Sequence, residues 1–119
     1  MGVATLTLLV GVGTPALAHH SFAMFDKNRK MTLSGTVSRF QWSNPHASVI
    51  VGVPDDKGGT LTYTLECSSP NLLGHQGWKF NTLKPGDPVS VEFYPLRDGD
   101  PGGALVSVKL PSGKVMRAY

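Results

Sequence analysis

The amino-acid sequence predicts a mainly β domain that closes into a small barrel. Short apolar segments alternate with a period of two, and turns rich in glycine and proline separate them. A helix-start signal, Ser69-Pro70, stands after the third of these segments. Three strands, a short helix and two or three further strands are the order of an OB-like barrel of five to six strands, with its helix between strands three and four. An open sandwich of the same strands is the alternative.

The first predicted strand covers residues 31–42 and bends. Its apolar residues lie on odd numbers at first and on even numbers later: Met31, Leu33 and Val37, then Phe40 and Trp42. A period of two changes phase only through an extra residue, so we expect a β-bulge near Ser38-Arg39, with Gly35 easing the bend. Ser43-Asn44-Pro45 ends the strand.

The other strands follow the same alternation. We expect them at residues 47–53, 60–67, 88–94, 104–110 and 114–119. The inner face of the third strand carries four apolar side chains: Leu61, Tyr63, Leu65 and Cys67. Cys67 is the only cysteine, so it forms no internal disulfide, and its position predicts a buried, unreactive thiol.

Between the third and fourth strands we expect a helix of two turns at most. Ser69 suits the N-cap and Pro70 the first helical position, while Gly77 is a natural stop. Trp78 follows the helix and is expected to plug one end of the barrel. Pro85-Gly86 fits the two central positions of a type II turn that leads into the fourth strand.

Residues 1–18 predict a signal peptide that is removed on export. They carry no charged side chain, and their apolar run ends in Ala16-Leu17-Ala18, a small-residue cleavage site. Because glycines and Pro15 interrupt the run, we expect no stable membrane insertion after processing; a retained N-terminal anchor is the alternative. The mature periplasmic chain would then have an N-terminal arm, residues 19–30, and a single β-barrel domain, residues 31–119.

The distribution of charge argues against nucleic acid as a partner. The chain has 11 Lys and Arg against 8 Asp and Glu, a formal net charge of +3, and these residues are interspersed without a basic block. Domains that bind nucleic acid gather basic residues on one face. We therefore expect no nucleic-acid partner, and the predicted export agrees with this.

Cleavage after Ala18 would leave a free amine on His19. The α-amine and the Nδ1 of a terminal histidine can close a chelate on one metal ion, and a further imidazole would complete a planar nitrogen set, which favours Cu(II). Both groups can release their protons to a metal near neutral pH. The predicted metal ligands are His19, His20, His46 and Met24. His46 would supply the further imidazole and Met24 a soft axial donor, with copper as the metal and zinc as the alternative.

Simpler roles remain open for the same residues. His19 and His20 could be solvated polar residues, and His46 could hydrogen-bond to a backbone carbonyl at a turn. His75, near the end of the short helix, is expected to be structural because an imidazolium is favoured there. Glu66 has no evident carboxylate partner for acid–base chemistry.

The chain also resembles a known family of small exported bacterial proteins. The motifs that carry the resemblance are His19-His20-Ser21-Phe22-Ala23-Met24-Phe25-Asp26, Gln41-Trp42-Ser43-Asn44-Pro45-His46, Ser69-Pro70-Asn71-Leu72-Leu73, Gln76-Gly77-Trp78, Leu83-Lys84-Pro85-Gly86-Asp87, and Pro95-Leu96-Arg97-Asp98-Gly99 with Pro101-Gly102-Gly103. The family is described only as a domain of unknown function. The resemblance covers nearly all of the mature chain and implies a periplasmic single-domain protein, without implying an activity.

These observations favour an exported metal-binding protein that holds copper through its processed N-terminal histidine. The alternative is a non-catalytic OB-like module that binds a periplasmic partner protein or a small ligand. We expect no enzymatic activity, because the sequence offers no second catalytic group beside the predicted metal ligands.

Overall fold

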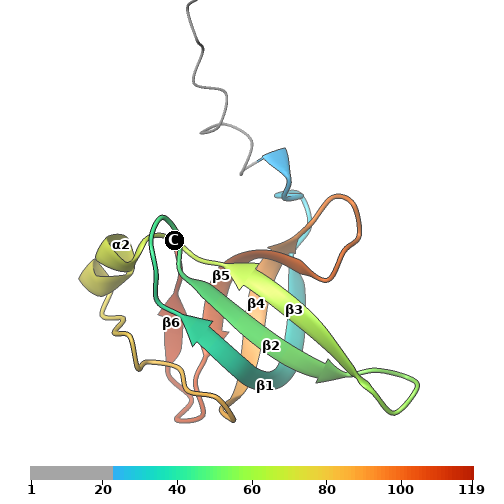
Figure 1. The fold of residues 1–119 in the computed structure, drawn as a ribbon. Coiled ribbons are helices and arrows are strands. Elements are labelled where there is room, and N and C mark those ends of the chain that lie inside the picture. Colours follow the sequence, from blue (N-terminus) through green and yellow to red (C-terminus); the bar gives the residue numbers. More distant parts are fainter. Residues whose placement is uncertain (1–22) are drawn as a thin grey trace, which may run out of the picture.

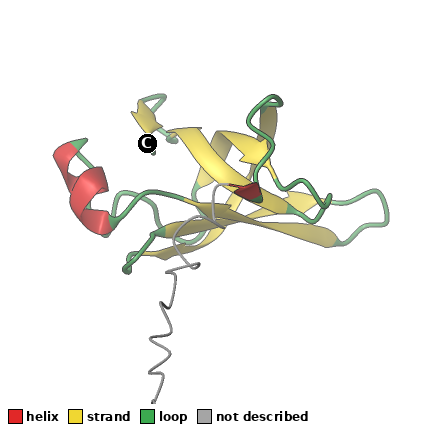
Figure 2. Cartoon of the chain, turned by 90° about the horizontal axis from the view of Figure 1, so that it is seen from above, coloured by secondary structure: helices red, strands yellow, loops and turns green. Residues whose placement is uncertain are grey.

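The computed structural model describes residues 23–119, and their elements follow the predicted order (Figure 1). The elements are β1 (Met31–Gln41), β2 (Ser48–Pro54), β3 (Thr60–Glu66), α2 (Pro70–His75), β4 (Pro88–Pro95), β5 (Gly102–Lys109) and β6 (Val115–Arg117). The expected position of the helix, between the third and fourth strands, is therefore confirmed. Helix α2 and the hairpin that joins β2 to β3 lie at opposite ends of the molecule in both views (Figure 1 and Figure 2).

The sheet closes on itself. Its strand order is β3-β2-β1-β4-β5-β6, and β3 pairs in addition with β5. This closing pair is parallel and spans only Thr64–Glu66 against Gly102–Ala104. Strands β1 to β5 therefore form a closed barrel with the strand order of an OB-like fold, and β6 extends the sheet beyond β5. The open sandwich is excluded.

The predicted bulge in β1 is confirmed. Val37 pairs with Val51, but Arg39 pairs with Ile50, so the register with β2 shifts at Ser38. The bend brings β1 and β2 close together: a Cβ on Gly35 would lie 2.7 Å from Val51 Cγ1. Such a bulge bends a strand and increases its twist, which lets β1 pair with β2 on one edge and β4 on the other.

The inner faces of the strands make the core. Among the fully buried side chains are Val37, Val49, Val51, Leu65, Val91, Phe93, Leu105 and Val108. The prediction for β3 is wrong at Leu61, which is 42% exposed. Leu61 precedes the three residues of β3 that pair with β5, so its part of the strand has β2 as its only ladder partner within the described chain.

Helix α2 begins and ends where the sequence predicts. The Ser69 hydroxyl accepts a hydrogen bond from the Leu72 backbone N–H at 3.3 Å, and Pro70 is the first helical residue. The helix ends before Gly77, whose φ is 92°. Trp78 is then buried in the core, and its indole Nε1 donates to the Arg117 carbonyl at 2.7 Å. This bond ties the end of the helix to β6.

The turn before β4 also has the predicted form. The Asp87 N–H donates to the Lys84 carbonyl at 3.1 Å, and Gly86 has a φ of 94°. A positive φ at the third residue is what a type II turn requires, and glycine meets it without strain.

Close packing between β4 and β5 predicts a strong effect of substituting Gly103. A Cβ on Gly103 would meet the Tyr94 backbone oxygen and lie 2.7 Å from Phe93 Cδ2. Gly103→Ala should therefore lower the free energy of unfolding by about 1–3 kcal/mol, the usual cost of overpacking a well-packed core. Urea denaturation measures this change.

Gly74→Ala is the matched control, because a Cβ on Gly74 of α2 would meet nothing within 4 Å. It should leave stability unchanged or raise it by up to about 1 kcal/mol, since alanine favours helix. Equal stabilities of the two variants would contradict the closeness of β4 and β5 at Gly103.

Candidate metal site

The described part of the N-terminal arm, residues 23–30, is held against the segment that follows β4. The Asp26 N–H donates to the Pro95 carbonyl at 2.8 Å, and the Arg97 N–H donates to the Met24 carbonyl at 2.9 Å. Phe25 is 3% exposed and forms an isolated β-bridge with Leu96. Phe25 therefore fixes the described part of the arm to the domain.

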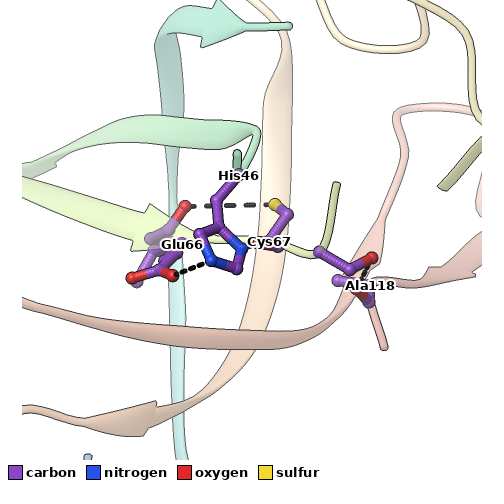
Figure 3. Close-up of polar contacts among 6 residues, drawn as sticks. His46, Glu66, Cys67 and Ala118 are labelled. Carbon is purple, nitrogen blue, oxygen red and sulfur yellow. Dashed lines mark hydrogen bonds and ion pairs between the residues drawn. The ribbon is translucent and has the colours of Figure 1, made fainter. Parts of the chain in front are cut away.

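His46 lies just before β2, and both of its ring nitrogens have a partner. Its Nδ1 is 3.1 Å from the Cys67 carbonyl oxygen, which can only accept, so Nδ1 carries a proton and donates. Its Nε2 is 3.4 Å from Glu66 Oε1, and Figure 3 shows the imidazole facing that carboxylate. The simpler role of His46, a hydrogen bond to a backbone carbonyl, is thus confirmed. Such a bond is also what orients histidines that bind metals through the other nitrogen.

An open pocket of about 500 Å³ brings the arm and His46 together. It is lined by Met24, Phe25, Pro45, His46, Ser48, Thr64, Glu66, Leu96, Pro101 and Gly103. Its residues come from the arm, from the segment before β2 and the first residue of β2, from β3, and from the loop between β4 and β5 with the beginning of β5. Most of its wall is apolar, and His46 and Glu66 form its one ionisable pair.

Two of the four predicted metal ligands therefore line the same pocket. Met24 is 53% exposed and belongs to the arm, which precedes β1. The His46 side chain is 36% exposed and belongs to the loop that joins β1 to β2. His19 and His20 lie outside the described residues. Within residues 23–119 no three His, Cys, Asp or Glu side chains gather as a metal-binding group.

Glu66 belongs to this site although the sequence did not predict it there. The signal was present in the β2–β3 hairpin, whose register pairs Ser48 with Glu66. Extending that register by two residues along the chain places His46 diagonally across from Glu66 on the same face. Diagonal neighbours on a sheet can reach each other when one side chain is long, as glutamate is here.

Cys67 is buried, as predicted, and does not take part in the pocket's chemistry. Its side chain is inaccessible, and burial raises the pKa of the thiol to about 12, with a smaller contribution from the Glu66 charge. Its Sγ lies 3.9 Å from the Leu65 carbonyl oxygen (Figure 3). A thiol of so high a pKa is protonated at neutral pH, and metals bind the thiolate.

The sequence model of a protein family matches residues 6–106, and the family is described as a family of unknown function, DUF6152. The chain belongs to this family. Membership in DUF6152 agrees with the resemblance to a domain of unknown function and assigns no activity. No curated protein and no solved structure matches the chain. In the part of this DUF6152 protein that the structure describes, no helix has the length and apolar character to cross a membrane.

The burial of Cys67 predicts a dependence of stability on pH. The unfolded thiol ionises with a pKa near 9.0, whereas the folded thiol stays protonated up to about 12. Between these values the unfolded state binds fewer protons than the folded state, so this thiol's contribution to stability falls as pH rises. The advantage in free energy of unfolding of the native protein over Cys67→Ala should therefore shrink from pH 9 upward.

Urea denaturation of both proteins at a series of pH values measures this difference. Using the difference removes the contribution of lysines and tyrosines that titrate in the same range. A difference that stays constant between pH 8 and the alkaline limit of the measurement would contradict the burial of the thiol.

Proposed function

We propose that this DUF6152 protein is an exported, periplasmic metal-binding protein whose metal is copper. Processing after Ala18 exposes the α-amine of His19, which chelates the ion together with its own Nδ1. An imidazole from His46 completes the nitrogen set, and Met24 provides a soft donor that tolerates Cu(I). His20 is the nearest further imidazole along the chain. The protein serves as a carrier or buffer and not as an enzyme.

The observation that carries this proposal is that Met24 and His46 line one pocket. They are far apart in the sequence, and the arm reaches the pocket because its backbone is bonded to Pro95 and Arg97. Covalent geometry limits how far His20 can lie from this anchor: three residues span at most about 11 Å from Ala23. Met24, which follows Ala23, lines the pocket together with His46.

The tautomer and the fixed orientation of the His46 ring also favour metal binding. Because its Nδ1 donates to the Cys67 carbonyl, Nε2 is the nitrogen that carries the lone pair in the neutral ring. That nitrogen belongs to a side chain that lines the pocket and is partly exposed. A fixed ring orientation lowers the entropy lost on binding.

A second function is favoured by the walls of the same pocket. A volume of about 500 Å³ with mostly apolar walls and a few polar groups is the usual form of a site for a small organic ligand. The chain would then be a non-catalytic OB-like binding module for a small ligand or a periplasmic partner protein. This function requires no free terminus, which separates it from metal binding.

The requirement for a free His19 amine gives the first test. Protein that begins at His19 should bind one Cu(II) ion in a competition titration. Protein whose His19 amine is acetylated should bind at least about tenfold more weakly, because the acylated nitrogen no longer offers a lone pair to close the chelate. Equal affinities of the two proteins would remove the chelate, and with it this function, and would leave the binding module.

The imidazole of His46 gives the second test. His46→Ala should weaken Cu(II) binding by about tenfold or more, because one nitrogen ligand is lost. His75→Ala is the matched control, since His75 is exposed in the last turn of α2 and does not line the pocket. Electron paramagnetic resonance of the copper should show one fewer nitrogen in His46→Ala alone. An unchanged spectrum and affinity would contradict the role of His46.

A further inference from the structure

Glu66 lines the pocket beside His46. It is the last residue of β3, its side chain is 28% exposed, and its carboxylate faces the His46 ring. Within residues 23–119 His46 is its one ion-pair partner. The carboxylate is thus partly exposed, and an ion that enters the pocket from solvent can reach it.

The distance between the two side chains suits ligands of one ion. Glu66 Oε1 and His46 Nε2 are 3.4 Å apart, longer than the 2.7–2.9 Å or so of a close charge-assisted hydrogen bond. Two donors that each lie about 2.0–2.1 Å from a common metal ion are about 2.9 Å apart at the angle of about 90° of a planar set, and about 3.4 Å apart at about 110°. A metal ion can therefore bridge both atoms with little movement of either side chain.

We propose that Glu66 is a ligand of the metal that His46 binds, and that its carboxylate makes the site favour Cu(II) over Cu(I). This inference rests on the proposed function, since it assigns a further ligand to the same site. A carboxylate is a hard, anionic donor and favours the doubly charged ion, whereas the thioether of Met24 is soft and favours Cu(I). Both side chains line the pocket. The two residues thus act in opposite directions on the oxidation state that the site holds.

Glu92 provides a comparison within the same chain. It lies on β4 and pairs with Lys30 at 3.3 Å, nearly the distance of the Glu66–His46 pair. Its partner is an ammonium group, which cannot bind a metal while charged, and neither residue lines the pocket. Glu92→Gln therefore removes a similar ion pair and a similar negative charge without touching the site.

The experiment compares three proteins that begin at His19: the native chain, Glu66→Gln and Glu92→Gln. Glu66→Gln should bind Cu(II) about 10–100-fold more weakly, the range seen when a metal site loses one supporting group, and should bind Cu(I) as the native protein does. The parallel g value and copper hyperfine coupling should change in Glu66→Gln and stay native in Glu92→Gln. Glu66→Asp, which keeps the carboxylate, should bind Cu(II) more tightly than Glu66→Gln.

The outcomes separate this inference from the function on which it rests. Native Cu(II) affinity and spectrum in Glu66→Gln, with affinity lost when the His19 amine is acetylated, would overturn the role of Glu66 and keep the copper site. Native Cu(II) affinity in Glu66→Gln and also in the protein with the altered terminus would overturn both the role of Glu66 and the copper site. An equal loss for Cu(II) and Cu(I) would overturn the selectivity, because it would show a general effect on the pocket. Thermal unfolding of each variant confirms that the comparison is made between folded proteins.

Discussion

The contact between the N-terminal arm and the end of β4 fixes the position of the first described residues of the chain. Two backbone hydrogen bonds, from Asp26 to Pro95 and from Arg97 to Met24, hold the arm as a short extension of the sheet. Arg97 adds a bond from its side-chain Nε to the Ala23 carbonyl at 3.0 Å. Phe25 buries its ring at the same place, so apolar burial supports the polar contacts. Because of this attachment, Met24 lines the same pocket as His46.

Much of the fold could be predicted because its signals are local. The phase change in β1 indicated the bulge, and Ser69, Pro70 and Gly77 indicated the helix. The exposure of Leu61 could not be predicted. The alternation of apolar and polar residues indicates which face of the strand a side chain occupies, but not where the barrel closes. Closure depends on the parallel pairing of β3 with β5, which joins segments far apart in the chain.

The candidate site was predictable only where its signals were local. His46 and Met24 were chosen by residue type and by their positions beside a strand end and an arm, and both line the pocket. Glu66 was not chosen, because its relation to His46 runs diagonally across two paired strands and depends on their register. Residue type alone gave no reason to connect a glutamate on β3 with a histidine before β2.

The central claim is that the processed terminus and His46 bind the same ion. A crystal structure of the protein that begins at His19, grown with one equivalent of Cu(II), tests this most directly. The account predicts a single copper ion bonded to the His19 amine, to the His19 ring and to His46 Nε2. Copper bound at the terminus alone, with His46 Nε2 not bonded to it, would contradict it.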